Sequence, residues 1–268
     1  MQLYKLQTKT HINTAHSKLL DNIAYASSLG IREFQRSDMA LKGKPVAIVG
    51  SGPSLEKTWQ LLKNFPGDII ATNAASDYLV ERGIIPSYHM IIDAEQKTAK
   101  YVQNPNKDII YIVASQCDKL VFDALQNYEK ILITLYQDIG EPIDGLRIGG
   151  GCMVGMRALY FSAALGYRDY HLFGIDSCFS NGDYYVTGQQ NSTQDNIISV
   201  FCNDREFKCT VGMAHQANDF KESLVKLGSC GLLNSLEVYG DSLLKEIWEA
   251  SKKIAIEKNK EKYARNVL

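Results

Sequence analysis

The stretch that decides the fold is residues 46–55, which read VAIVGSGPSL. The apolar residues 46–49 have the length and composition of a buried strand, and an amphipathic segment follows over residues 55–62. Between them lies a turn made of Gly50, Ser51, Gly52, Pro53 and Ser54. A glycine-rich turn from a strand into a helix directs backbone N–H groups and the helix dipole at one point, where a phosphate can bind. We therefore take these five residues as nucleotide-binding candidates.

A purely structural turn is the alternative interpretation of the same residues. The turn is not a P-loop, because no Gly-Lys-Ser/Thr follows it, and it lacks the third glycine of the dinucleotide fingerprint. A Gly-x-Gly after a strand is weak evidence when it stands alone. The rest of the chain has to supply the context.

Composition excludes several classes of protein. The 268 residues are 45% hydrophobic, enough to bury the core of one large α/β domain. With Lys+Arg 29 and Asp+Glu 30, the net charge of −1 gives no overall field for nucleic acid or an anionic membrane. The six cysteines form no CxxC pair and have no zinc-site spacing with the five histidines. The sequence contains neither a signal-peptide pattern nor a membrane-length apolar run, so we expect a cytoplasmic protein.

Strand-like and helix-like segments alternate along the chain. Further apolar runs that predict strands lie at residues 69–72, 89–93, 109–114, 131–135, 170–175 and 236–239. Segments that predict helices lie between them at residues 74–82, 95–102, 117–128 and 154–165. Strands separated by helices of this length indicate βαβ crossovers. The predicted fold is therefore α/β and Rossmann-like, a doubly wound, mostly parallel sheet of about seven strands.

The segments outside this alternation define the expected domain organisation. Residues 1–43 form an N-terminal segment with a helical pattern over 12–36, residues 44–240 form the nucleotide-binding catalytic domain, and residues 241–268 form a C-terminal helix. That helix is a solvated surface helix or one that packs in a homo-oligomer. Residues 177–212 are polar and lack clear periodicity, which is typical of a functional lid. We expect the lid to extend to about residue 215 and to be mobile without ligand.

Polar residues follow several predicted strands where they end. Asn73, Asp93 and Asp176 hold such positions, and ligands of open parallel sheets bind at the carboxyl ends of the strands. An asparagine amide can bond a ribose or a base, and the two aspartates can bind ribose hydroxyls or a metal. Helix capping is the alternative for Asn73 and Asp93. Gly150 and Gly151 precede a predicted helix and form either a second nucleotide contact or a turn that needs positive φ.

Taken together, these residues resemble the bacterial lipooligosaccharide sialyltransferases. The similar segments, in chain order, are residues 50–55, 72–73, 163–169, 174–176, 181–182, 185 and 212–215, and the similarity extends to residues 234–235. The opening Gly-x-Gly-Pro-Ser and the Gly-Ile-Ile-Pro-Ser at residues 83–87 are also similar to the motility accessory factor proteins. Archaeal hydroxymethylpterin diphosphokinase-like proteins share the same features. The resemblance covers roughly residues 44–240.

The resemblance implies a nucleotide-sugar-dependent glycosyltransferase that works without a metal. In such sialyltransferases a lid histidine is the general base on the acceptor hydroxyl, and lid tyrosines bond the leaving phosphate. The matching residues are His215 and Tyr185, with Tyr184 as the neighbouring residue, and CMP-linked sugars are among the donors that the resemblance implies. The family's first lid tyrosine falls near Cys178 or Phe179, so half of that phosphate clamp is replaced here. A lid residue with only local bonds is the alternative for His215.

Two other functions remain open at this point. An ATP-dependent diphosphotransferase acting on a pterin needs Mg²⁺ and carboxylates to hold it, which Asp93 and Asp176 would supply. A non-catalytic nucleotide-binding protein would keep the fold without the chemistry. For the transferase, the resemblance implies a nucleotide-sugar donor and a glycan or protein acceptor, with a nucleic-acid acceptor still open.

Overall fold

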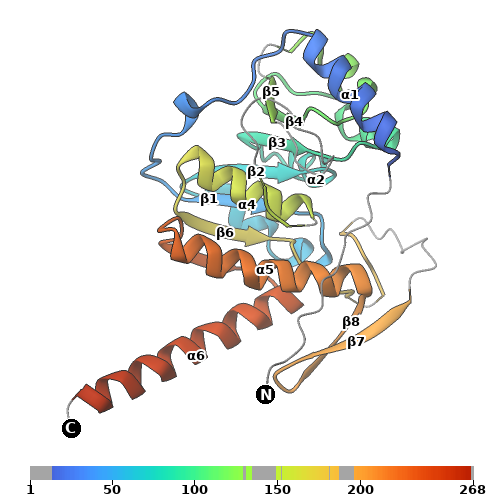
Figure 1. The fold of residues 1–268 in the computed structure, drawn as a ribbon. Coiled ribbons are helices and arrows are strands. Elements are labelled where there is room, and N and C mark those ends of the chain that lie inside the picture. Colours follow the sequence, from blue (N-terminus) through green and yellow to red (C-terminus); the bar gives the residue numbers. More distant parts are fainter. Residues whose placement is uncertain are drawn as a thin grey trace.

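A parallel sheet lies at the centre of the computed structural model, which describes residues 14–128, 131–134, 149–151, 153–180, 182–186 and 196–266 (Figure 1). The sheet has seven strands in this part of the chain, in the order β5-β4-β3-β2-β1-β6-β9, and every neighbouring pair is parallel. These strands are β1 (Val46–Val49), β2 (Asp68–Thr72), β3 (Tyr88–Ile91), β4 (Ile110–Ala114), β5 (Ile131–Thr134), β6 (Asp169–Phe173) and β9 (Ser235–Val238). The expected doubly wound α/β fold is confirmed.

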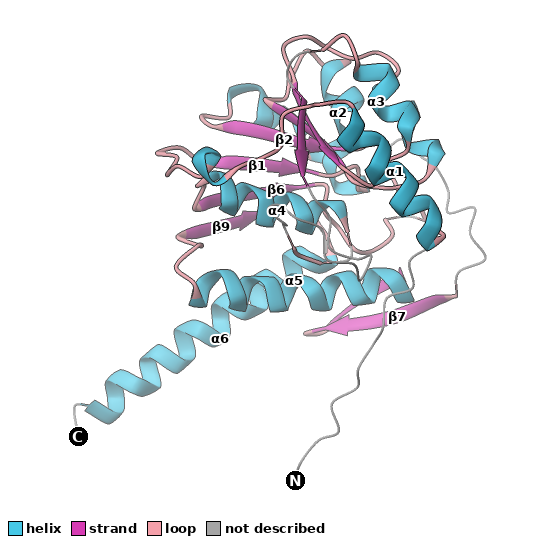
Figure 2. Cartoon of the chain, turned by 45° about the horizontal axis from the view of Figure 1, so that its top comes forward, coloured by secondary structure: helices cyan, strands magenta, loops and turns pink. Residues whose placement is uncertain are grey.

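Helices cover both faces of the sheet, and this explains why its central strands are apolar throughout. In β1, Val46 and Ile48 belong to one core layer, while Ala47 and Val49 belong to the other. The helices α4 (Val154–Leu165) and α5 (Val211–Ser229) lie on the first face, as Figure 2 shows. The second face is covered by η2 (Pro53–Lys57), η3 (Trp59–Asn64), α2 (Ala75–Val80), η4 (Gln96–Val102) and α3 (Lys119–Leu125).

Two predicted helices have a 3₁₀ form. Residues 55–62 were predicted to be one helix, but they form parts of two 3₁₀ segments, η2 and η3, that meet at Thr58. The Thr58 hydroxyl donates to the Ser54 carbonyl at 3.0 Å and competes with the helical backbone pattern. Residues 95–102 likewise form the 3₁₀ segment η4.

The N-terminal helix is shorter than its predicted span of residues 12–36. Within the described residues it is α1 (His16–Ser28), and Gly30 follows it with φ +63°. A glycine in this left-handed conformation is a common helix stop, because no Cβ opposes it. Between Gly30 and the start of β1, the chain contains one helical segment, η1 (Arg36–Asp38).

The expectation that residues 177–212 lack regular structure is wrong for their second half. An antiparallel hairpin of β7 (Ile197–Cys202) and β8 (Arg205–Thr210) lies there, while residues 187–195 are outside the described part. Asn203 stands in its two-residue turn with φ +52°, a conformation that asparagine tolerates. Arg205 contacts Asp241 at 2.7 Å and Glu246 at 3.1 Å. These ion pairs tie the hairpin to the chain segment after β9.

The helix α5 begins directly after this hairpin and was missed because residues 212–215 were assigned to the lid. Its buried positions follow a helical spacing, which is a sequence signal that could have found it. Those positions are Met213, Ala217, Phe220, Ser223 and Leu227. The Thr210 hydroxyl caps the helix by accepting a hydrogen bond from Met213 N at 3.1 Å.

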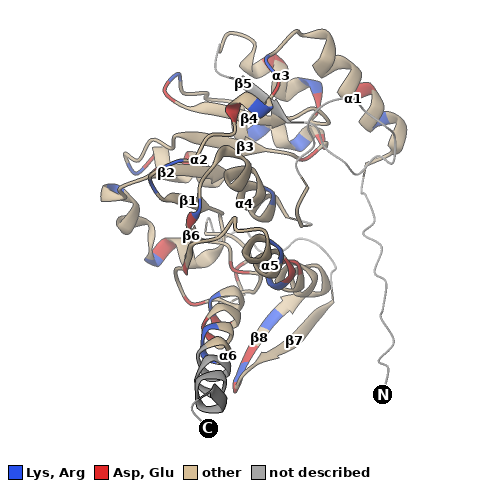
Figure 3. Ribbon diagram, turned by 60° about the vertical axis from the view of Figure 1, so that its left-hand side comes forward, with Lys and Arg blue, Asp and Glu red and all other residues tan. Residues whose placement is uncertain are grey.

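The C-terminal helix is confirmed as α6 (Leu243–Asn266). Its first residues, Leu243 and Leu244, are buried, and the helix then extends away from the sheet. Figure 3 shows positively and negatively charged residues mixed along the ribbons of α6 and β8. No helix in the described ranges is long and apolar enough to cross a membrane.

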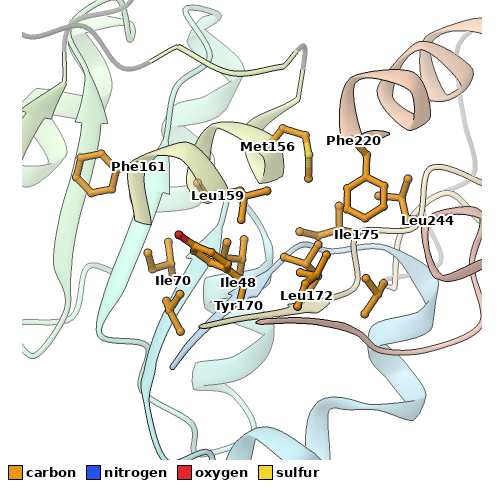
Figure 4. Close-up of a cluster of buried hydrophobic side chains, with 14 of the residues drawn as sticks. Ile48, Ile70, Met156, Leu159, Phe161, Tyr170, Leu172, Ile175, Phe220 and Leu244 are labelled. Atoms are coloured by element: carbon orange, nitrogen blue, oxygen red, sulfur yellow. The ribbon is translucent and has the colours of Figure 1, made fainter. Parts of the chain in front are cut away.

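The main core cluster fixes α4 and α5 against the sheet, as Figure 4 shows. Met156 and Leu159 of α4 and Phe220 of α5 point toward the strand residues Ile48 and Leu172. Each of these side chains is almost fully buried. Complete burial of a side chain of this size stabilises a fold by about 1.5–3 kcal/mol. This packing gives the loops at the carboxyl ends of the strands a rigid base.

Candidate nucleotide-binding site

The candidate site lies at the carboxyl edge of the sheet, where the strand order reverses. β1 has β2 on one side and β6 on the other, so the connections that leave its end diverge. Ligands of doubly wound sheets bind at such switch points. The turn at residues 50–54 follows β1, Asn73 follows β2, and Asp176 lies just after β6. The structure therefore brings three groups of the predicted residues to one edge.

The turn after β1 packs tightly against the segment after β6. Gly50 N donates to the Phe173 carbonyl, and Gly52 N donates to the Gly174 carbonyl, both at 2.8 Å. A Cβ added at Gly52 would lie 2.7 Å from the Gly174 oxygen and 2.6 Å from Asp176 Oδ2. Glycine is therefore required here by packing within the protein.

The backbone donors of this turn are nearly all used within the protein. The N–H groups of Gly50, Gly52 and Ser54 donate to acceptors at the end of β6 and just after it, and Pro53 has no N–H. Ser51 N is the remaining donor of residues 50–54 for which the described chain offers no partner. The predicted cradle of several N–H groups is therefore reduced to one, and the helix that follows is the short 3₁₀ segment η2. The number of free N–H groups therefore fits a purely structural turn better than a phosphate-binding turn.

Asp176 acts as a clamp between β6 and the turn. Its Oδ2 accepts a hydrogen bond from Ser54 N at 2.8 Å, and its Oδ1 accepts one from Ser54 Oγ at 2.5 Å. Burial raises the pKa of this carboxyl to about 6, although the two bonds from Ser54 lower it. Asp176 and Ser54 thus face each other, and the geometry does not favour the predicted role of Asp176 on a ribose or metal. The described residues contain no group of three or more potential metal ligands.

Asn73 has the features of a ligand-binding side chain. It follows β2 with φ +48°, a left-handed conformation that is uncommon for a residue with a side chain. Its Oδ1 is buried and has no hydrogen-bond partner among the described residues. Buried polar atoms are nearly always bonded, so each exception needs an explanation. Helix capping is not that explanation, because α2 has no side-chain cap.

Asp93 caps the helical segment that follows it and also lies among the candidate site residues. Its exposed carboxylate accepts a hydrogen bond from Glu95 N at 3.0 Å, which orders the start of η4. The same carboxylate is an electrostatic neighbour of Lys97, Tyr101 and Tyr185. Burial raises the pKa of Tyr101 to about 12, with Tyr185 and Asp93 adding to the shift. Asp93 therefore belongs to a cluster that includes the predicted catalytic tyrosine.

Tyr185 is held close to the turn after β1. Val186 N donates to the Ser51 carbonyl at 2.8 Å, so the tyrosine segment lies against this turn. The rings of Tyr184 and Tyr185 have centroids 4.3 Å apart. Burial raises the pKa of the Tyr185 phenol, and the positive charge of Lys97 opposes this rise. The phenol therefore keeps its proton at neutral pH and is a hydrogen-bond donor.

Gly150 and Gly151 are explained by backbone conformation. Their φ angles are +121° and +51°, so the alternative of a turn that needs positive φ fits both. A Cβ on Gly151 would stand 3.6 Å from a carboxylate oxygen of Asp219. The start of helix α4 does lie at the carboxyl edge of the sheet, because Gly155 packs against Ile175 just after β6.

His215 lies on the helix α5 and not in a polar loop. Its side chain is exposed, and none of the described residues forms a hydrogen bond with it. The neighbouring Gln216 accepts a hydrogen bond from Ser177 Oγ at 3.5 Å, so this part of α5 lies beside the end of β6. Within the described contacts, His215 and Tyr185 do not meet.

Sequence reasoning missed several polar residues at this edge. His89 is 1% exposed, and its Nε2 lies 2.9 Å from the Asn73 carbonyl oxygen. Ser115 Oγ and Gln116 Oε1 follow β4 and are buried without a partner in the described ranges. Inspection of the residues after β4, as was done for β1, β2 and β3, would have found the pair.

The helix α1 closes the same edge on the β3–β4 side. The Asn22 amide nitrogen donates to the Gln116 carbonyl at 2.8 Å and to the Ala94 carbonyl at 3.4 Å. Leu19 and Ile23 pack on Ala94. The part of the edge left for a ligand therefore lies nearer to β1 and β2.

A protein-family model matches most of the chain that forms this sheet. The model described as 6-hydroxymethylpterin diphosphokinase MptE-like matches residues 17–182, which is more than half of the chain. This chain belongs to the MptE-like family. The match includes every strand of the sheet except β9. No curated protein matches the chain by sequence.

Solved structures of glycosyltransferases are similar to this MptE-like protein. The MAf glycosyltransferase from Magnetospirillum magneticum AMB-1 has a TM-score of 0.62 at 18% identity, over 86% of this chain and 38% of that protein. This chain thus spans well under half the length of that relative, and the likeness shows a shared fold. The sialyltransferase CstII from Campylobacter jejuni, in complex with the substrate analogue CMP-3FNeuAc, has a TM-score of 0.45 at 20% identity. That match covers 75% of this chain and 84% of CstII.

Proposed function

We propose that this MptE-like protein is a glycosyltransferase that moves a sugar from a nucleotide-sugar donor to a glycan or protein acceptor. The donor binds at the carboxyl edge of β1 and β2. The observation that carries the proposal is the bond from Val186 N to the Ser51 carbonyl. This bond holds the Tyr184–Tyr185 pair against the turn after β1, close to Lys97 and Asp93. The donor chemistry is supported further by the structural likeness to the MAf glycosyltransferase.

The leaving phosphate is the group that this cluster suits. As the bond from sugar to phosphate breaks, negative charge grows on the phosphate oxygens. The protonated Tyr185 phenol donates a hydrogen bond to that charge, and the Lys97 ammonium, which also pairs with Glu95 at 2.5 Å, adds electrostatic stabilisation. Ser51 N supplies a further donor. These groups can stabilise the phosphate without a metal ion, and the proposed donor includes CMP-linked sugars.

His215 is the proposed general base. It accepts the proton of the acceptor hydroxyl, whose oxygen attacks the anomeric carbon as the nucleotide leaves. Imidazole is the side chain best matched to proton transfer near neutral pH. The exposed position of His215 on α5 leaves it accessible to an acceptor. Closure of the segment around Tyr185 over the donor would exclude water, which would otherwise hydrolyse the donor.

A cavity of about 640 Å³ next to the tyrosine pair is the proposed acceptor space. It lies between residues 178–182 and the β7–β8 hairpin. Its described lining includes the charged residues Arg205, Lys208, Glu206 and Asp241. Two positive and two negative groups balance each other, which suits a neutral, hydroxyl-rich molecule better than an anion. Phe179 lines this cavity and also contacts the Tyr184 ring at 5.9 Å between centroids, which links the two regions.

Diphosphoryl transfer is the second candidate, because the family description names a 6-hydroxymethylpterin diphosphokinase. That reaction requires ATP and Mg²⁺ held by carboxylates. Both oxygens of Asp176 accept hydrogen bonds from Ser54, and one oxygen of Asp93 is bonded to Glu95 N. The two predicted metal ligands are therefore committed to the protein, which favours sugar transfer.

A thermal-shift panel with a metal control tests the proposal. CMP-, UDP- and GDP-sugars are compared with ATP, each with Mg²⁺ and with EDTA. A ligand at a hundredfold its Kd stabilises the fold by about 2.7 kcal/mol. We expect one nucleotide-sugar to raise Tm and its turnover to survive EDTA. A shift and a turnover that require both ATP and Mg²⁺ would select the diphosphokinase. Nucleotide binding without turnover of any donor would indicate a non-catalytic protein.

A further inference from the structure

A buried histidine on β3 contacts the backbone of Asn73. His89 lies in the interior of the strand and is 1% exposed. Burial lowers the pKa of its imidazole to about 4, so the ring is neutral at physiological pH. A carbonyl oxygen can only accept a hydrogen bond. The 2.9 Å contact from Nε2 to the Asn73 oxygen therefore places the ring proton on Nε2.

The same residue pair explains why Asn73 holds an unfavourable conformation. Non-glycine residues rarely adopt a positive φ, and Asn73 has φ +48°. Its N–H donates to the Met90 carbonyl at 3.3 Å, while its carbonyl accepts from the His89 ring at 2.9 Å and from Ser76 N of α2 at 3.3 Å. Both polar groups of the Asn73 backbone are thus bonded, with His89 as the nearer donor to the carbonyl. Such over-determined conformations are concentrated at functional sites.

The amide of Asn73 is left without a partner on its buried side. Its Oδ1 is shielded from solvent and has no hydrogen-bond partner in the described ranges, although the residue as a whole is half-buried. The χ2 torsion of asparagine is broad, so the amide can turn without leaving its rotamer. A ligand that donates a hydrogen bond to this oxygen would satisfy it.

We infer that His89 is a positioning residue, which holds Asn73 so that its amide oxygen accepts a hydrogen bond from a hydroxyl or amino group of the bound nucleoside. The inference rests on the proposed function, because it assumes that a nucleotide binds at this edge. His89 itself does not touch the ligand. It acts through the backbone of Asn73, and its effect is on affinity for the nucleoside.

Substitutions at His89 separate this role from simple packing. His89→Gln keeps an N–H donor near the position of Nε2, while His89→Phe keeps the bulk and removes the donor. The probes are CMP, UDP, GDP and ATP, titrated by calorimetry into the full chain. We expect His89→Phe to raise the Kd of the nucleotide that binds by about tenfold. The Kd of His89→Gln should stay within about threefold of the parent value. One lost neutral hydrogen bond has an effect of this order.

A matched control and a second background complete the experiment. His171 on β6 is likewise a strand histidine, although half-buried, and its Nδ1 lies 2.9 Å from the Tyr239 hydroxyl. His171→Phe should leave nucleotide affinity unchanged. In an Asn73→Ala background, His89→Phe should cause no further loss. Parental affinity in His89→Phe, or the same loss with and without Asn73, would overturn the inference.

A measurement on the parent protein covers the case in which His89→Phe does not fold. The ¹⁵N resonances of the His89 ring report its tautomer and its hydrogen bond. We expect a neutral ring protonated at Nε2, with a resonance that shifts when the nucleotide saturates the protein. An unchanged resonance at saturation would overturn the inference. If none of the four nucleotides binds the parent, the proposed function fails instead, and the two failures are distinguishable.

Discussion

Replacement of Asp176 by asparagine tests whether this residue is a structural clamp or a ligand-binding group. The carboxyl is 5% exposed, and its pKa is about 6 compared with an ordinary value of 3.8. The folded state therefore binds the proton more tightly than the unfolded state. The stability that comes from the protonated form is fully present below pH 3.8 and is lost as the pH rises through 6. A difference of about two pKa units corresponds to about 3 kcal/mol.

Asparagine at this position keeps the hydrogen-bond capacity without the charge. Its oxygen can accept from Ser54 N, and its nitrogen can donate to Ser54 Oγ. Asp176→Asn is therefore expected to match the parent near pH 4 and to be more stable at pH 8, by up to about 3 kcal/mol. Asp176→Ala leaves two Ser54 donors without their acceptor and should lose about 3 kcal/mol near pH 4. Its deficit relative to the parent should shrink at pH 8, because only the parent has a carboxyl to ionise.

Urea unfolding of the three proteins at pH 4, 6 and 8 checks these values, with nucleotide affinity measured on the same samples. The clamp assignment requires that Asp176→Asn keeps parental affinity. A difference from the parent that does not change with pH would refute the pKa reasoning. A large loss of affinity in a stable Asp176→Asn protein would refute the clamp assignment and restore the ligand role.

Three further predictions concern the edges of the same site. Asn22→Ala removes two hydrogen bonds that α1 makes to β3 and β4, and it should lower the unfolding free energy by about 1–2 kcal/mol, measured in urea. His215→Ala should keep donor affinity and lose about 10²–10⁴-fold in turnover, the usual contribution of a general base; near-parental turnover would remove His215 from the mechanism. Tyr185→Phe should lower turnover less than His215→Ala, because one hydrogen bond to the leaving phosphate is lost; an equal or larger effect would show that the phenol has another role.

The fold was predictable because its signals are local and repeated. Each central strand is a short apolar run, and helical segments separate the runs, so the parallel sheet followed from the pattern. The hairpin was predictable in principle, since Asn203 and Asp204 form a two-residue turn between two strand-like runs. It was missed because polar residues on its exposed positions resemble a loop. The helix α5 was missed for another reason, since the family resemblance gave residues 212–215 to the lid.

The candidate site was only partly predictable, because its roles depend on three-dimensional partners. The sequence predicted that the residues after β1, β2, β3 and β6 lie at one edge of the sheet, and the structure agrees. It could not indicate that Asp176 faces Ser54, since these residues are 122 positions apart. It also gave His89 no role, because an imidazole within a buried strand has no local signal. Only its contact with the Asn73 carbonyl reveals one.

Amide hydrogen exchange with and without nucleotide tests the central claim most directly. The claim is that the nucleotide binds at the carboxyl edge of β1 and β2, against Ser51, Asn73 and Tyr185. Peptides that contain residues 50–54, 72–76 and 183–186 should exchange more slowly when the stabilising nucleotide of the thermal-shift panel is present. A second cavity, of about 560 Å³, lies at the opposite edge of the sheet, where Lys63 and Arg82 are part of its lining. Slower exchange confined to residues 62–69 and 82–87, with no change at the carboxyl edge, would contradict the claim.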